Sequence, residues 1–143
     1  MHFVTLANSS KIKTDFVSST IKAGFPSPAE DYIDRKIDLN EQLIANPAAT
    51  FMVRVEGSSM IDCGINEQDV LIVDKSLKAK DKDIILAVVD GEFTVKTLAL
   101  HAKYGAPRLL PANSTGAYAP IEITEDMQFQ VWGVVIGSFR RFK

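Results

Sequence analysis

The chain of 143 residues contains a single cysteine, Cys63, so it forms no internal disulfide. Structural disulfides belong to oxidising compartments, and we therefore expect a cytoplasmic protein. The N-terminus has no basic segment followed by a long apolar run, which argues against a secretory signal. No stretch approaches the roughly 18 consecutive apolar residues that a membrane-spanning helix requires. We expect no association with a membrane.

An excess of charge of one sign is also missing. The net charge is −2, from 16 basic and 18 acidic side chains, so the chain lacks the basic surplus with which proteins bind nucleic-acid phosphates. Apolar residues make up 46% and charged residues 24%, as in an ordinary globular protein. The length is sufficient for one domain with its own hydrophobic core and one additional segment.

Metal-binding and cofactor-binding patterns are absent as well. Histidine occurs only twice, at His2 and His101. Six aspartates lie close together in the chain: Asp62, Asp69, Asp74, Asp81, Asp83 and Asp90. They stand beside glycine, lysine or the ends of apolar runs, which is typical of turns, and no metal-ligand spacing, phosphate loop or dinucleotide fingerprint occurs. We expect no metal ion and no cofactor.

Residues 1–37 differ in composition from the rest of the chain. They contain the polar clusters 8–11 and 18–20 and two prolines, Pro26 and Pro28, and they show neither helical nor alternating periodicity. The sequence therefore predicts a flexible N-terminal arm over residues 1–37. A short helix is expected after Asp38, because Glu41 stands three residues later as in a capping box.

Residues 38–143 show the pattern of a β-rich domain. Apolar and polar residues alternate from residue 51, and Asp90-Gly91 between two apolar runs is a strong signal of a hairpin. The expected strands are 51–55, 70–73, 84–89, 93–100, 109–110, 118–123 and 129–139. No long helical pattern separates them, so we predict a mostly β fold with an antiparallel sheet, sandwich-like or barrel-like.

Ser59 is the candidate nucleophile, in the segment Gly57-Ser58-Ser59-Met60 at the end of a predicted strand. Gly57 allows a sharp turn that can aim backbone N–H groups at a developing oxyanion. The alternative is an ordinary turn serine, since serine beside glycine usually only forms turns. Cys63 is a rival nucleophile without a histidine nearby, and we expect its thiol to be buried or semi-buried.

A serine hydroxyl requires a base, and two residues compete for this role. His101 in a turn-like stretch leaves a Ser/His/Asp triad open. Lys96 lies in an apolar strand, where burial without a carboxylate partner keeps an amine uncharged. Strand alternation instead places Lys96 opposite Phe93 and Val95, which favours a lysine on the solvent face. The residues alone leave these alternatives open.

Three segments in order resemble one known family: Ala23–Pro28, Gly57–Ile65 and Asp90–Lys96. They are similar to the UmuD proteins, relatives of the self-cleaving domain of the LexA repressor, over nearly the whole chain. The resemblance implies a LexA/UmuD-like β domain, Ser59 as nucleophile, Lys96 as general base and Ala23-Gly24 as the peptide bond that is cut. The backbone amides of Ser59 and Met60 are then expected to bind the oxyanion.

The resemblance also implies a biological role. In this family the cut is triggered by a RecA filament on single-stranded DNA during the SOS response. The shortened product, residues 24–143, is expected to form a homodimer and to serve a UmuC-type translesion polymerase. LexA-type repressors carry a DNA-binding domain before the cleavage site. Because only 23 residues precede the expected cut, we expect no direct sequence-specific binding of DNA.

Two other functions remain open from the sequence. One is a non-catalytic β scaffold that binds a polymerase and retains a vestigial Ser-Lys pair. The other is an enzyme that acts on other chains, as signal peptidases do with the same Ser-Lys chemistry, although those enzymes normally carry a membrane anchor.

Overall fold

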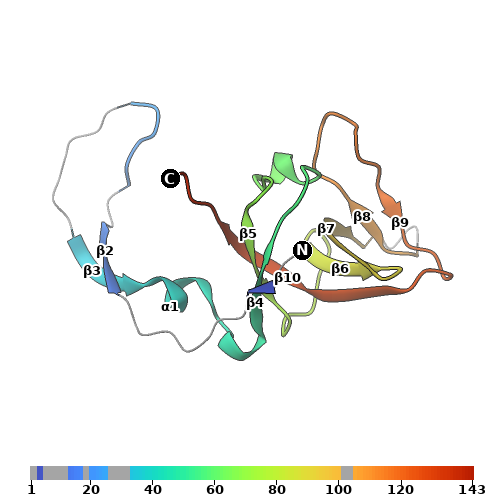
Figure 1. Cartoon of the computed structure of the whole chain (residues 1–143), viewed down its shortest axis with the longest axis horizontal. Coiled ribbons are helices and arrows are strands. Elements are labelled where there is room, and N and C mark those ends of the chain that lie inside the picture. The colour runs from blue at the N-terminus through green and yellow to red at the C-terminus, as the bar shows by residue number, and fades with distance from the viewer. Residues whose placement is uncertain (1–2, 5–12, 18–19, 26–32, 101–104) are drawn as a thin grey trace. The chain divides into compact units, whose positions relative to one another are not determined.

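The computed structural model describes residues 3–4, 13–17, 20–25, 33–100 and 105–143 (Figure 1). The chain divides into two compact units: Met1–Leu6 with Asn46–Lys143, and Ala7–Ala45. The elements in chain order are β1 (Phe3–Val4), β2 (Lys13–Val17), β3 (Ile33–Asp38), α1 (Leu39–Leu43), a 3-10 turn (Pro47–Ala49), β4 (Thr50–Arg54), a second 3-10 turn (Ile61–Cys63), β5 (Val70–Asp74), β6 (Ile84–Val89), β7 (Glu92–Ala99), β8 (Arg108–Leu110), β9 (Ile121–Glu122) and β10 (Phe129–Phe139).

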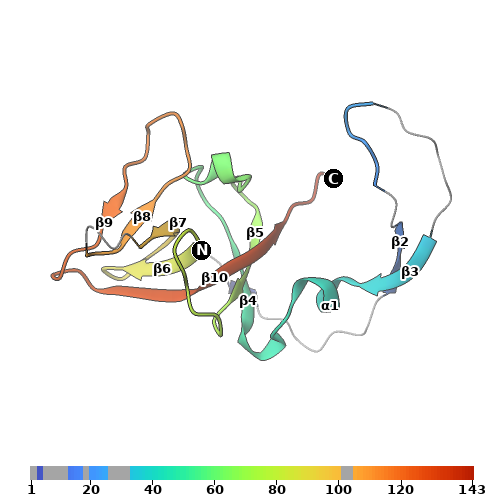
Figure 2. The same cartoon turned by 180° about the vertical axis from the view of Figure 1, so that it is seen from behind.

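The larger unit is built around one antiparallel sheet, so the prediction of a mostly β fold is confirmed. In the described part of the chain this sheet has eight strands in the order β1-β4-β5-β10-β6-β7-β8-β9. The long strand β10 lies between β5 and β6 and is visible from both sides (Figure 1, Figure 2). Strand β9 is shorter than the expected 118–123, because only Ile121 and Glu122 pair with β8.

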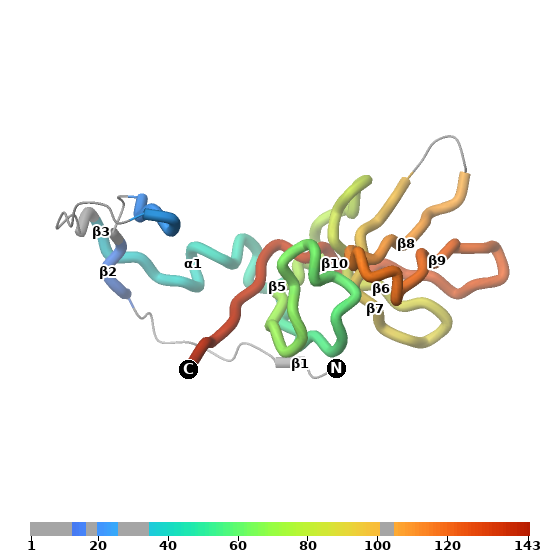
Figure 3. The backbone as a smooth tube through the Cα atoms, turned by 90° about the horizontal axis from the view of Figure 1, so that it is seen from above, coloured from blue at the N-terminus to red at the C-terminus, as the bar shows by residue number. Residues whose placement is uncertain are grey.

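Strand β10 connects the two halves of the sheet because its two ends pair with different strands. Its first half pairs with β6 and its second half with β5, beside which it also lies in the tube view (Figure 3). The register shifts before Gly133, and a Cβ at that position would lie 2.6 Å from Cγ1 of Val73 and 2.9 Å from the carbonyl oxygen of Asp74. The backbones approach so closely there that only glycine fits.

The hairpin predicted at Asp90-Gly91 is present. Val89 pairs with Glu92, and both turn residues have positive φ, 50° for Asp90 and 82° for Gly91. This is the turn that the right-handed twist of the two strands favours, and aspartate followed by glycine adopts it readily. The hairpin brings β7, with Lys96, alongside β6.

In β6, side chains on both faces of the strand are buried. Leu86 belongs to one core cluster, with Val53, Val73 and others, whereas Ile85 and Ala87 belong to a second cluster around Leu109. Successive side chains of a strand point to opposite faces, so both faces of this part of the sheet are covered. Strand alternation therefore does not separate core from solvent here.

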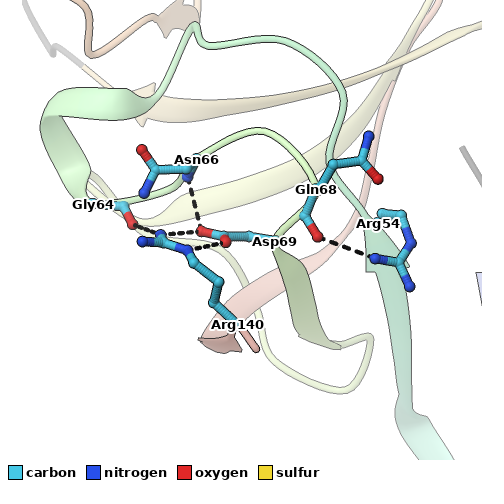
Figure 4. Close-up of polar contacts among 6 residues, drawn as sticks. All are labelled: Arg54, Gly64, Asn66, Gln68, Asp69 and Arg140. Atoms are coloured by element: carbon cyan, nitrogen blue, oxygen red, sulfur yellow. Dashed lines mark hydrogen bonds and ion pairs between the residues drawn. The ribbon is translucent and has the colours of Figure 1, made fainter. Parts of the chain in front are cut away.

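A bidentate ion pair fixes the end of β10 to the loop before β5. Arg140 Nε lies 2.5 Å from Asp69 Oδ1 and Nη2 lies 2.6 Å from Oδ2, while the backbone N–H of Asn66 donates to the same carboxylate (Figure 4). The Asp69 side chain is only 2% exposed. The Arg140 guanidinium holds the pKa of this carboxyl below its usual range.

The smaller unit contains a two-stranded sheet that the sequence analysis did not anticipate. Strands β2 and β3 pair from Lys13 opposite Asp38 to Val17 opposite Ile33. The expected boundary between residues 37 and 38 falls inside β3. The pairing joins residues about 20 positions apart, which periodicity within a short window does not detect.

The capped helix expected after Asp38 is present as α1. The Asp38 side chain accepts a hydrogen bond from the N–H of Asn40 at 2.8 Å and so satisfies one of the free donors of the first turn. Asp38 is therefore both the last residue of β3 and the cap of α1, which is why the compact unit continues to Ala45.

Candidate active site

Ser59 lies in a tight turn between β4 and β5. Gly57 has a φ of 84°, a conformation that residues with a side chain rarely adopt, and it turns the chain out of β4. Met60, on the other side of Ser59, is only 3% exposed and belongs to the first core cluster. The nucleophile candidate is thus half-buried on a turn whose following side chain is anchored in the core.

Lys96 on β7 points its amine at this turn. Its Nζ lies 2.9 Å from Ser59 Oγ, within hydrogen-bonding distance, although the two residues are 37 positions apart in the chain. Nζ also lies 3.0 Å from Thr94 Oγ1 and 3.1 Å from the carbonyl oxygen of Val95. The structure therefore brings together the two residues that the sequence analysis singled out.

Burial lowers the pKa of Lys96 below its usual value of 10.5. Lys96 is only 9% exposed, and water that would solvate the ammonium ion is largely excluded. Among the residues that the structure describes, no carboxylate forms an ion pair with Lys96. The equilibrium is thereby shifted toward the uncharged amine, which is the form that can accept a proton from a hydroxyl.

The alternation argument for a solvent-facing Lys96 is wrong. Val95 and Lys96 are both buried although they are consecutive in a strand, and Lys96 stands opposite Ile85 of the second core cluster. Both faces of the β6–β7 hairpin are covered, so the residues that alternation assigns to the solvent side are also enclosed.

Two backbone amides lie directly at the nucleophile, those of Ser59 and Met60. Within the described residues, neither the N–H of Ser59 nor that of Met60 donates a hydrogen bond. The carbonyl oxygen of Ser59 accepts from the N–H of Ala112 at 2.7 Å, and that of Met60 accepts from the N–H groups of Cys63 and Ile65. Two free donors beside a serine hydroxyl are the elements of an oxyanion site.

A cleft of about 420 Å³ opens beside the Ser59–Lys96 pair. Val55 and Phe93 contribute apolar wall, and the exposed residues Arg54, Glu56 and Glu92 also line it. A cleft that has an apolar wall and is lined by residues of β7 and of the β4 end suits an extended peptide, which binds by its backbone and by alternate side chains.

Comparison with known proteins decides the family. The family model described as Peptidase S24-like matches residues 15–136, which include Ser59, Lys96 and the segment Ala23-Gly24. The chain belongs to the Peptidase S24-like family. The resemblance to UmuD and LexA proteins that the three motifs indicated is confirmed at this level, and the family is one of peptidases.

Several curated relatives match most of the chain. The chain is 41% identical to the protein MucA of Salmonella typhimurium over 123 residues, which are 86% of this chain and 82% of that relative. It is 47% identical to the protein SamA of Salmonella typhimurium strain LT2 over 113 residues, 79% of this chain and 75% of the relative. It is 39% identical to LexA repressor 1 of Xanthomonas campestris over 125 residues, 87% of this chain and 60% of that repressor.

The expected cleavage pair, Ala23 and Gly24, lies in the smaller unit between β2 and β3. Both residues are exposed and lie outside any helix or strand. A Cβ added at Gly24 would meet no atom within 4 Å. A peptide bond between small, exposed residues without regular pairing is accessible to a peptidase.

The sequence analysis also considered His101, Cys63 and a possible metal site. His101 lies outside the described residues. Cys63 is exposed rather than buried, which corrects our expectation for its thiol, because the 3-10 turn Ile61–Cys63 runs on the surface. In the described ranges, no group of three or more histidine, cysteine or carboxylate side chains is placed to hold a metal, and no helix is long and apolar enough to cross a membrane.

Three residues of the site were missed by sequence reasoning: Thr94, Asn113 and Tyr118. Thr94 carries a detectable signal, since it stands two positions before Lys96 and so shares its face of the strand. Asn113 and Tyr118 reach Ser58 from 55 and 60 positions away in the chain. Contacts at this separation have no local signature.

Proposed function

We propose that the chain is a self-cleaving serine peptidase that cuts its own Ala23-Gly24 bond with a Ser59–Lys96 dyad. One observation carries the proposal: a buried lysine amine, with no carboxylate partner among the described residues, lies 2.9 Å from a serine hydroxyl beside an open cleft. The family assignment to peptidases supports it independently.

In the first half of the reaction, the uncharged Nζ of Lys96 takes the proton of the Ser59 hydroxyl. The Ser59 oxygen attacks the carbonyl carbon of Ala23, and the amides of Ser59 and Met60 stabilise the oxyanion that forms. The bond to the Gly24 nitrogen then breaks as Lys96 returns its proton to that nitrogen. The products are an ester between Ala23 and Ser59 and a free amine at Gly24.

In the second half, water replaces the amine. Lys96, uncharged again, takes a proton from water, whose oxygen attacks the ester carbonyl. The ester bond breaks and the Ser59 oxygen regains a proton. Residues 1–23 leave with a new carboxylate at Ala23. The electrons and protons balance without a metal or a cofactor.

Attachment of the substrate to the enzyme explains why a modest dyad suffices. A tethered peptide has a high effective concentration, so little binding energy is needed to hold it. Control then lies in docking of the segment around Ala23-Gly24 at Ser59. A partner that favours the docked state acts as a switch, because a ligand shifts an equilibrium toward the state that it binds better.

We further propose the cellular role that the resemblance to UmuD proteins implies. A RecA filament on single-stranded DNA is the switch, and residues 24–143 form a homodimer that serves a UmuC-type translesion polymerase in the SOS response. The similarity to MucA and SamA over most of the chain supports this assignment. We propose no direct sequence-specific contact with DNA for the uncut chain.

The test is self-cleavage of the purified full-length chain at pH 7 and at pH 10, followed by mass spectrometry. We expect fragments that end at Ala23 and begin at Gly24, with faster cutting at the higher pH because more Lys96 is uncharged there. Ser59→Ala and Lys96→Ala should abolish both fragments. Lys78→Ala, which removes an exposed lysine, is the matched control and should cut at the wild-type rate.

Two further conditions separate the alternatives. If the wild type remains uncut at both pH values and also with a RecA filament on single-stranded DNA, the chain is a binding scaffold with a vestigial dyad. If the rate constant rises with protein concentration, cutting occurs between chains rather than within one. If an unrelated polypeptide is cut equally well, the chain is a general peptidase.

A further inference from the structure

The segment Ala112-Asn113, in the connection between β8 and β9, is bonded to the turn that carries Ser59. Asn113 Nδ2 donates to the carbonyl oxygen of Ser58 at 2.8 Å, and the N–H of Ala112 donates to the carbonyl oxygen of Ser59 at 2.7 Å. The bonding is mutual, because the N–H of Asp62 donates to the carbonyl oxygen of Ala112 at 2.8 Å. Two consecutive carbonyl groups of the nucleophile turn therefore face the same neighbouring segment. The Ser58 carbonyl oxygen also accepts from the N–H of Ile61, at the longer distance of 3.3 Å.

The planarity of the peptide bond gives this arrangement a chemical consequence. In a trans peptide the C=O and the following N–H point in opposite directions. The Ser58 carbonyl shares a plane with the N–H of Ser59, and the Ser59 carbonyl shares a plane with the N–H of Met60. Because both carbonyls point to the segment Ala112-Asn113, both N–H groups point away from it. These are the two unoccupied donors of the site.

The N–H of Ser58 differs from those of Ser59 and Met60 because it has a partner. That N–H lies 3.5 Å from the hydroxyl of Tyr118, whose oxygen also lies 3.2 Å from Ser58 Oγ. The Tyr118 hydroxyl therefore contacts both the N–H and the side-chain hydroxyl of Ser58, the residue before the nucleophile. Among the described residues the N–H groups of Ser59 and Met60 have no acceptor, and both are oriented through the carbonyl groups of their peptide planes.

Asn113 is itself held in one orientation. Its Oδ1 accepts from the N–H of Thr115 at 3.0 Å and from Thr115 Oγ1 at 2.6 Å. An amide side chain has its acceptor on one atom and its donors on the other, so these two bonds turn Nδ2 toward Ser58. Asn113 is half-buried, and its side chain is held by two hydrogen bonds from Thr115. It therefore fixes the plane of the Ser58–Ser59 peptide more tightly than a mobile surface side chain would.

We propose that Asn113 is a positioning residue of the oxyanion site, which orients the Ser59 amide through the Ser58 carbonyl. The inference rests on the proposed self-cleavage and adds a residue to it. Asn113 acts through the backbone, and in the described structure it neither lines the cleft nor bonds to Lys96. Its loss should therefore slow the chemical step without changing the protonation of the base. Removal of an oxyanion donor costs about 100- to 1000-fold in rate, and misorientation of one costs less.

The experiment compares self-cleavage of full-length variants over a range of pH. Asn113→Leu keeps the branched shape but removes the donor, and we expect a rate plateau at high pH about 10- to 100-fold below that of the wild type. The pH at half-maximal rate should stay at the wild-type value. Ser114→Ala is the matched control, because in the described structure that side chain forms no hydrogen bond, and it should cut like the wild type.

A second variant controls for the possibility that Asn113→Leu disturbs the structure of the loop. Asn113→Asp keeps an acceptor for both bonds from Thr115 and places a carboxylate oxygen, which cannot donate and repels the Ser58 carbonyl, where the donor stood. The cleavage rate of Asn113→Asp at high pH, where Lys96 is uncharged, should reach the same low plateau as that of Asn113→Leu. Plateaus within about twofold of the wild type in both variants would overturn the proposal. A normal plateau reached only at higher pH would also overturn it, because Asn113 would then act on the base.

Reaction of Ser59 with a fluorophosphonate probe gives a readout that does not require docking of the cleavage segment. The Ser59 hydroxyl gives its proton to Lys96, its oxygen bonds to phosphorus, and fluoride leaves. The developing charge on the phosphoryl oxygen uses the same donors. We expect slower labelling in both Asn113 variants than in the wild type. A wild type that fails to cut itself overturns the proposed function, and labelling then tests Asn113 alone: equal labelling of wild type and variants contradicts its role.

Discussion

Thr94 Oγ1 lies 3.0 Å from Lys96 Nζ, and the two side chains share one face of β7. The Val95 carbonyl lies 3.1 Å from the same nitrogen. An uncharged amine has two N–H donors and one lone pair. When the two N–H groups donate to Thr94 and Val95, the lone pair is left for the hydroxyl of Ser59. The strand that carries the proposed base therefore also orients its amine.

This arrangement makes Thr94 a test of orientation. Thr94→Val keeps the shape but removes the acceptor, and we expect self-cleavage to slow about 10-fold, at the low end of what general-base catalysis contributes. Thr94→Ser keeps the oxygen and should retain most of the rate. The measurement is the first-order rate constant of cutting at several pH values.

The pH dependence of the Thr94 variants separates orientation from a change in basicity. An acceptor near Nζ favours the ammonium form, so its removal does not raise the pKa of Lys96. The half-maximal rate of Thr94→Val should therefore lie at or below the pH of the wild type. A shift to higher pH would contradict our assignment of Thr94.

Burial of Lys96 should destabilise the fold at neutral pH. Its pKa in the folded chain is lowered from 10.5, so the unfolded chain binds the proton more tightly. The cost is complete below the folded pKa, decreases as pH rises, and vanishes above 10.5. In a Ser59→Ala background, Lys96→Met should unfold at a higher temperature at pH 7. The gain should shrink toward pH 10.5, and a gain that is constant with pH would contradict this account.

The pair Asp69–Arg140 should stabilise the end of β10 in a pH-dependent manner. Arg140→Ala leaves the Asp69 carboxylate buried with only the Asn66 amide, and thermal unfolding should occur at a lower temperature. Because the pKa of Asp69 is lowered from 3.8, the difference from the wild type should be complete above about pH 4 and shrink in stronger acid. Arg141→Ala, which changes an exposed neighbour, is the control. An equal loss in both variants would exclude a specific role for the pair.

Gly133 should not tolerate a side chain. A Cβ there would meet Val73 Cγ1 at 2.6 Å, whereas a Cβ at Gly137 on the same strand would meet its nearest neighbour, Ile72 Cδ1, at 3.7 Å. We expect Gly133→Ala to lower the free energy of unfolding by about 1–3 kcal/mol, as overpacking of a core does. Gly137→Ala should change it by less than about 0.5 kcal/mol. Urea denaturation of both variants measures the difference, and equal effects would contradict the close approach at Gly133.

Local patterns predicted much of the sheet. The alternation in β4, the apolar run of β5 and the Asp90-Gly91 turn each depend on neighbouring residues, and each element formed where expected. Strands β2 and β3 were missed because their pairing joins distant residues.

The site was predictable in its residue types but not in its environment. A serine after glycine and a lysine in an apolar strand are visible in the sequence, whereas the burial of Lys96 depends on which elements cover both faces of β7. The contact between Asn113 and Ser58 spans 55 positions, and only the folded sheet brings it about. The order of the three motifs carried the family assignment further than any single residue did.

Direct titration of Lys96 tests the central claim of an uncharged amine beside Ser59. Full-length Ser59→Ala protein with labelled lysine side chains, assigned by comparison with the Ser59→Ala, Lys96→Met variant, permits NMR measurement of the Lys96 Cε shift against pH. We predict a midpoint below 10.5, close to the pH at which the wild-type cleavage rate is half-maximal. A midpoint at or above 10.5 would contradict the account, because Lys96 would then be charged when Ser59 needs a base.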